Sequence, residues 1–157
     1  MKEFRVKRRD FCLRAVQITA VAGVADMLQA CGGGGPTSPS STNTPQLTSI
    51  SGSVANGVVT VPISASSPLA SVGSAALVQT SVGMFLVART ADSAFSVLTA
   101  TCTHQECTIT GFQNATYVCP CHGSTYNTSG VVLGGPAPRS LRQYPSQFAS
   151  DTLTWSA

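Results

Sequence analysis

Two short segments concentrate the residues of this chain that could do chemistry. Residues 102–107 read CTHQEC, and residues 119–126 read CPCHGSTY. Each segment offers one thiolate and one imidazole, spaced Cys-x-His in the first and Cys-x-x-His in the second, and each has one further cysteine. Thiolates and imidazoles are common ligands of zinc and of iron–sulfur clusters. Because both histidines and four of the six cysteines lie here, the sequence predicts a metal centre.

These two segments resemble the Rieske iron–sulfur protein family, in the quinol-linked branch found in cytochrome bc complexes. The resemblance implies a [2Fe–2S] cluster with four ligands: Cys102, His104, Cys119 and His122. It also implies a disulfide between the two remaining cysteines, Cys107 and Cys121. A structural zinc site is the alternative for a Cys2His2 set. Zinc would not explain the two extra cysteines.

Other positions resemble the surroundings of a Rieske cluster. Ser124 and Tyr126 match the family's hydroxyl donors to a bridging sulfide and to a ligand thiolate. Pro136 and Pro138, in the GGPAP run of residues 134–138, match the proline-rich loop that covers the cluster. The alternative for each is a role in ordinary turns. Donors to sulfur stabilise the more negative, reduced state, so we expect them to raise the reduction potential.

The ligand types themselves favour a high potential. With two thiolates and two neutral imidazoles, an oxidised [2Fe–2S] cluster is formally uncharged, whereas an all-cysteine cluster carries two negative charges. An electron is added more easily to a neutral centre, which places such clusters at about −150 to +300 mV. Histidine N–H groups could also couple proton transfer to electron transfer.

Residues 105 and 106 depart from the quinol-linked pattern. That branch usually has an apolar residue and a glycine after the first ligand histidine, whereas this chain has Gln105 and Glu106. The apolar residue belongs to the tip that docks on cytochrome b, so this docking is in question. A carboxylate near the cluster opposes reduction, and Glu106→Gly is therefore expected to raise the potential.

Short apolar runs that could position these segments follow one another from residue 49 onward. Asn56-Gly57 lies between runs rich in valine and isoleucine, which predicts a hairpin. A second hairpin is expected from residues 75–80 and 84–89, and no helical stripe follows residue 31. The fold expected over 49–157 is all-β: a Rieske-type antiparallel β-sandwich with a small cluster-binding subdomain at about 100–138.

Charge separates the first thirty residues from the remainder. The chain has 157 residues and a net charge of +3, but residues 31–157 hold three arginines and three carboxylates and are formally neutral. A neutral body without a basic stripe is a poor nucleic-acid binder, so no nucleic-acid partner is expected.

Residues 1–30 are expected to be an export signal. Arg8-Arg9 before an apolar segment resembles a twin-arginine signal, with the general secretion route as the alternative. The segment ends in LQAC, which resembles a lipobox and implies lipidation of Cys31. An uncleaved anchor helix and ordinary cleavage are the alternatives. Residues 31–48, rich in Gly, Pro, Ser and Thr, are expected to be a tether.

Together these features predict an exported protein on the periplasmic or extracytoplasmic face of a bacterial membrane, anchored by lipid. It would carry single electrons in a quinol-oxidising respiratory chain, with quinol and cytochrome b- or c-type proteins as partners. It is not expected to be catalytic alone. The alternative is a ferredoxin-like subunit serving a separate periplasmic oxidoreductase, whose large subunit would then be the partner.

Overall fold

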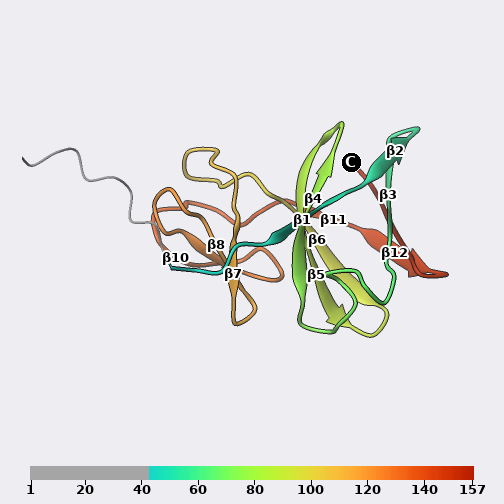
Figure 1. The fold of residues 1–157 in the computed structure, drawn as a ribbon. Coiled ribbons are helices and arrows are strands. Elements are labelled where there is room, and N and C mark those ends of the chain that lie inside the picture. The colour runs from blue at the N-terminus through green and yellow to red at the C-terminus, as the bar shows by residue number, and fades with distance from the viewer. Residues whose placement is uncertain (1–42) are drawn as a thin grey trace, which may run out of the picture. The chain divides into compact units, whose positions relative to one another are not determined.

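The computed structural model describes residues 43–157, which form three β-sheets and no α-helix (Figure 1). The leader, Cys31 and most of the predicted tether lie outside the described residues. Within residues 43–157 no helix is long and apolar enough to cross a membrane. The predicted all-β fold is confirmed.

A five-stranded sheet forms the middle layer. Its strands lie in the order β1 (Thr48–Ser51), β4 (Ala75–Thr80), β5 (Gly83–Ala91), β6 (Ala94–Thr99) and β11 (Gln143–Tyr144). All neighbouring strands pair antiparallel except β1 and β4, which are parallel. This one pair departs from the antiparallel arrangement expected from the sequence.

Two four-stranded sheets lie on either side of β4–β6 in Figure 1. One contains β12 (Ser146–Ala149), β13 (Thr152–Ser156), β3 (Val58–Pro62) and β2 (Ser53–Ala55). The other contains β10 (Val132–Gly134), β9 (Thr125–Asn127), β8 (Thr116–Val118) and β7 (Gly111–Gln113). The second of these sheets forms part of the cluster-binding subdomain.

Strand β5 shows how the middle sheet supports both neighbours. Successive side chains of a strand point to opposite faces. Phe85 and Val87 pack into a core with the β3 and β13 side chains, whereas Leu86 and Ala88 pack into a core with Tyr117 and the two free cysteines. The four β5 side chains are all buried, which explains why the strand reads as a continuous apolar run.

Both predicted hairpins are present. Asn56 and Gly57 join β2 to β3 with φ angles of 51° and 76°, which is the positive-φ geometry that tight hairpins require. Strands β4 and β5 pair from Ala75 to Thr80 and leave Ser81 and Val82 as the turn.

The end of the predicted tether belongs to the folded part. Leu47 is buried in the core of the cluster-binding half, and its N–H donates to Thr110 O at 2.7 Å. Gln46 forms an isolated bridge with Gly111. Residues 46–48 therefore pack against the body, because Leu47 supplies an apolar side chain that the preceding Gly/Pro/Ser/Thr run lacks.

Candidate metal centre

The first ligand segment, between β6 and β7, closes into a tight loop through its own main chain. The N–H of Cys102 donates to Cys107 O at 2.9 Å, and the N–H of Glu106 donates to Cys102 O at 3.0 Å. A bridge between Thr101 and Thr108 closes the base of the loop. Glu106 has a φ of 57°, in the left-handed region that costs a non-glycine residue energy.

The second ligand segment, between β8 and β9, repeats this pattern. The N–H of Cys119 donates to Ser124 O at 2.8 Å, and the N–H of Gly123 donates to Cys119 O at 3.1 Å. Gly123, with a φ of 70°, stands where Glu106 stands in the first loop. The two loops therefore share one backbone hydrogen-bond scheme, and each begins with a buried free cysteine.

The four predicted ligands lie on these two loops. Cys102 and Cys119 are buried, and neither is in a disulfide. The rings of His104 and His122 meet edge to face, with centroids 4.9 Å apart. His104 is half-buried and His122 is exposed. The Nδ1 atom of His104 is buried without a hydrogen-bond partner among the described residues, as expected of an atom whose partner is a metal.

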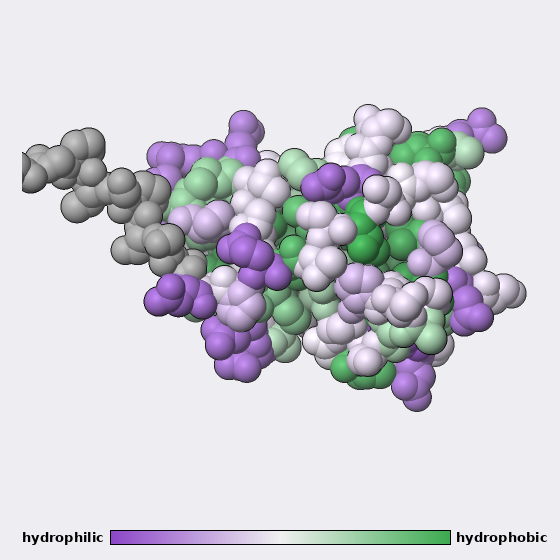
Figure 2. All heavy atoms as spheres, viewed as in Figure 1, coloured by the Kyte–Doolittle hydropathy of each residue, from purple (hydrophilic) through white to green (hydrophobic). Residues whose placement is uncertain are grey.

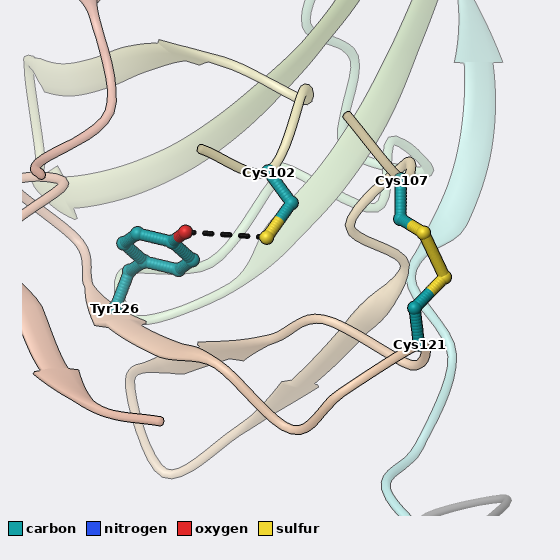
Figure 3. Close-up of a disulfide and its surroundings, with 4 residues drawn as sticks. All are labelled: Cys102, Cys107, Cys121 and Tyr126. Carbon is teal, nitrogen blue, oxygen red and sulfur yellow. Dashed lines mark hydrogen bonds between the residues drawn. A yellow bond between two sulfur atoms is a disulfide. The ribbon is translucent and has the colours of Figure 1, made fainter. Parts of the chain in front are cut away.

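A disulfide joins Cys107 of the first loop to Cys121 of the second (Figure 3), as the resemblance implied. The sulfur atoms of Cys107, Cys121 and Cys119 lie within 4.8 Å of one another. Because two of these sulfurs are bonded to each other, only Cys119 of this group can act as a thiolate ligand. The free donor set is therefore two thiols and two imidazoles.

Tyr126 points its hydroxyl at the first free thiol (Figure 3), at 3.3 Å from Cys102 Sγ. The same oxygen lies 3.2 Å from Thr103 Oγ1 and accepts the Thr103 N–H at 3.3 Å. The Thr103 hydroxyl in turn donates to Arg139 O at 2.7 Å. Sequence reasoning missed Thr103, because no motif marks a residue whose partners lie 23 and 36 positions away.

Ser124 is fully buried, and its Oγ has no hydrogen-bond partner among residues 43–157. A buried hydroxyl without a partner costs about 1–3 kcal/mol. A sulfur acceptor of a bound cluster would satisfy the Ser124 hydroxyl, and an iron atom would satisfy the unpartnered Nδ1 of His104. Both orphaned atoms thus fit a metal cluster at this site.

The two free thiols differ in their electrostatics. Burial raises the pKa of Cys102, but the Tyr126 hydroxyl and the N–H of His104 outweigh this, and the pKa lies below its usual value. Burial raises the pKa of Cys119, and the neighbouring Cys102 adds to the increase. The hydroxyl of Tyr126 thus favours the thiolate form of Cys102, which is the form that binds metal.

The proline-rich segment packs on the second loop through its backbone. A Cβ at Gly135, whose φ is 86°, would lie 2.6 Å from Ser124 Cα and 2.9 Å from Gly123 O. Only glycine allows this approach. Pro136 and Pro138 are exposed, whereas Ala137 between them is buried in the core beside the ligand loops. The sequence identified the segment but not its buried residue.

The comparisons with known proteins agree with this site. The Rieske [2Fe-2S] domain family matches residues 60–145. The chain is 41% identical over 61 residues to the cytochrome b6-f complex iron-sulfur subunit of Trichodesmium erythraeum, covering 38% of this chain and 34% of that protein. It is 45% identical over 58 residues to the ubiquinol-cytochrome c reductase iron-sulfur subunit of Blastochloris viridis, covering 36% and 32%.

A solved structure with the same fold is the ferredoxin of carbazole 1,9a-dioxygenase from Nocardioides aromaticivorans IC177. It has a TM-score of 0.50 and 17% identity, and the match covers 62% of this chain and 96% of that one. At this identity the likeness concerns the fold alone. The match to the two curated subunits spans about a third of their length.

The chain belongs to the Rieske [2Fe-2S] family, because the family match covers more than half of it and includes both ligand loops. Its cofactor is accordingly a [2Fe–2S] cluster, and the protein transfers electrons. The donor set of two buried thiols and two imidazoles fits this cofactor.

Proposed function

We propose that this Rieske protein is an exported, membrane-tethered carrier that moves single electrons in a quinol-oxidising respiratory chain. The similar proteins named as subunits of cytochrome b6-f and ubiquinol-cytochrome c reductase complexes support this proposal. The chain is not expected to be catalytic alone, because its two histidines are assigned to the metal.

The observation that carries the proposal is the Tyr126 hydroxyl at 3.3 Å from Cys102 Sγ. A carrier that takes electrons from quinol needs a high potential. A donor to a ligand sulfur raises the potential, since it stabilises the additional negative charge of the reduced state. The unpartnered Ser124 hydroxyl is available for the same purpose.

The chain's own residues have distinct roles in this proposal. Cys102, His104, Cys119 and His122 would hold the [2Fe–2S] cluster, which supplies one-electron chemistry at about −150 to +300 mV when bound. The disulfide between the loops fixes their separation. The ring of His122 is exposed, so this edge of the site is open to solvent and to a partner.

A potentiometric titration of the full-length protein with its cluster, followed by visible absorbance, tests this function. A clearly positive midpoint potential is expected. A midpoint well below zero would overturn the assignment to quinol oxidation. A colourless, zinc-containing protein would overturn the assignment to electron transfer altogether.

A second candidate is a Rieske subunit or ferredoxin that serves a separate periplasmic oxidoreductase. The exposed residues Gln105 and Glu106 favour this second candidate, because they make the tip of the first loop polar. In the quinol-linked branch this tip usually carries an apolar residue and a glycine. Reduction of the protein by a decyl-quinol in membranes containing a cytochrome b partner would favour the first candidate. Reduction only in the presence of the separate oxidoreductase and its substrate would favour the second.

The proposed location outside the cytoplasm rests on the leader and on the disulfide, which persists in an oxidising compartment. Fractionation of cells that express the full chain tests it. We expect the protein in the membrane fraction with a lipid on Cys31, visible by mass spectrometry of the mature N-terminus. Cys31→Ser should release or misprocess it, and Arg8→Lys with Arg9→Lys should block export if the twin-arginine route is used.

A further inference from the structure

A cavity of about 660 Å³ opens beside the first ligand loop. One wall is formed by this loop, including Cys102, His104 and Glu106, and the opposite wall by residues 139–142. His104 lines the cavity, so a molecule bound there would lie against one of the predicted ligands. The cavity therefore gives a partner direct access to the edge of the metal centre.

The cavity is lined by two of the three cationic side chains of the described residues. Residues 43–157 contain three cationic side chains at neutral pH, namely Arg89, Arg139 and Arg142. Arg89 is held in place: it donates to Ala70 O at 2.7 Å and to Asp92 O, and its guanidinium lies over two aromatic rings. The other two arginines are exposed, and both line the cavity.

One of the two cavity arginines is also pre-positioned. The Arg142 guanidinium lies 4.6 Å from the centre of the Tyr144 ring, in a cation–π contact. Arg139 follows the proline-rich segment, and its carbonyl oxygen is held by Thr103. Glu106 is the carboxylate on the cavity wall, so the wall carries a net charge of about +1. Figure 2 shows one face of the molecule, on which hydrophilic residues form separate groups among apolar and intermediate ones.

We propose that this cavity is the docking site for an acidic redox protein. The partner places a carboxylate-rich surface against Arg139 and Arg142, and this brings the partner's redox group near His104. Guanidinium groups bind carboxylates through two parallel hydrogen bonds, and such pairs orient a partner as well as attract it. The inference rests on the proposed electron-transfer function. In the transfer, the reduced Rieske protein loses one electron and the redox group of the oxidised partner gains it, with no bond made or broken.

Two forms of one haem protein provide the probe: mitochondrial cytochrome c, which is basic, and its fully succinylated form, in which the lysines end in carboxylates. Calorimetric titration with both proteins oxidised measures binding alone. Stopped-flow mixing of the reduced full-length Rieske protein with each cytochrome measures transfer. At about 10 mM salt, where the Debye length is roughly 30 Å, the succinylated form should bind more tightly and react faster.

Substitution of either arginine should weaken this preference. We expect Arg139→Gln and Arg142→Gln each to lower the affinity and the rate for the succinylated cytochrome by about 3–10-fold at low salt. Arg142→Lys should keep most of the effect, because it retains the charge. Glu106→Gln should strengthen binding by a few-fold. All differences should shrink toward none at about 0.5 M salt.

Gln147→Glu is the matched control. It changes the net charge by the same amount as Arg→Gln but lies on β12, an exposed position in the sheet on the other side of β4–β6. Its effect should be under about 2-fold. Equal effects of the control and the arginine variants would overturn the docking site, since only net charge would then matter.

Three further outcomes separate the alternatives. If the arginine variants weaken binding of ferrocyanide but not of succinylated cytochrome c, the cavity is a small-anion site and the protein docking site is wrong. If the protein titrates with one electron at a positive potential while the arginine variants bind succinylated cytochrome c normally, the docking inference fails and the electron-transfer function stands. If no reversible one-electron titration is found, the proposed function fails whatever the binding result.

Discussion

The hydroxyl of Tyr126 has one proton and two acceptors within reach. Cys102 Sγ lies at 3.3 Å and Thr103 Oγ1 at 3.2 Å. Thr103 uses its own hydroxyl proton on Arg139 O at 2.7 Å, so toward Tyr126 it can only accept. The two acceptors therefore compete for the Tyr126 proton, and Thr103 limits how fully Tyr126 stabilises the sulfur.

Two substitutions separate these contributions to the reduction potential. A hydrogen bond to a charged group is worth about 1.5–3 kcal/mol, and we take about 1 kcal/mol as the difference between redox states. A tenfold change in a one-electron equilibrium corresponds to 59 mV, so 1 kcal/mol is about 40 mV. Tyr126→Phe should therefore lower the potential by about 40 mV. Thr103→Val, which removes the competing acceptor, should raise it by roughly half as much.

The double variant tests the mechanism itself. If Thr103 acts through the Tyr126 proton, Thr103→Val should have no effect in the Tyr126→Phe background. Thr103→Ser keeps the hydroxyl and should leave the potential unchanged. The assay is a potentiometric titration of the four cluster-loaded variants, monitored by absorbance and circular dichroism. A Thr103→Val shift of equal size in both backgrounds, or an unchanged potential in Tyr126→Phe, would refute the reasoning.

Substitutions at three other positions each test a single feature of the structure. Glu106→Gly should raise the reduction potential, and it should also raise the free energy of unfolding by about 1 kcal/mol because the φ of residue 106 is 57°. Glu106→Gln should raise only the reduction potential. Equal unfolding free energies for the two variants in denaturant titrations would contradict the strain argument. Tyr117→Phe should leave the visible spectrum of the cluster unchanged. It should stabilise the fold by about 1 kcal/mol, because the buried Tyr117 hydroxyl has no hydrogen-bond partner among the described residues. A destabilised variant would mean that this hydroxyl does have a partner. Gly135→Ala should speed loss of the cluster's visible absorbance several-fold, since its Cβ would clash with Ser124, and wild-type kinetics would show that the loop adjusts.

Elements with strong local signals could be predicted from the sequence. The hairpin at Asn56-Gly57 was recognisable because these residue types adopt positive φ readily. The ligand loops were recognisable because their cysteines and histidines recur at fixed spacing. In both cases the information lies within a few residues, so no knowledge of long-range packing is needed.

Elements without such signals were missed. Two hairpins turn at Asn114-Ala115 and at Ser150-Asp151, where all four residues have φ between 47° and 57° but none is glycine. Strands β7, β9 and β12 each contain only three or four residues, too few to show alternation. The parallel pairing of β1 with β4 brings together residues 48 and 76, a separation over which short local patterns carry no information.

The backbone of each ligand loop is held by bonds within the protein. Each loop is closed by two main-chain hydrogen bonds of the same kind, and the disulfide fixes one loop against the other. These bonds restrain the two loops that carry the four predicted ligands and so limit the conformations open to their side chains. This scheme requires a positive φ at the fifth residue of each loop, supplied at no steric cost by Gly123 and at some cost by Glu106. The carboxylate of Glu106 lines the cavity together with Arg139 and Arg142, where its negative charge opposes both reduction of the cluster and the approach of an acidic partner.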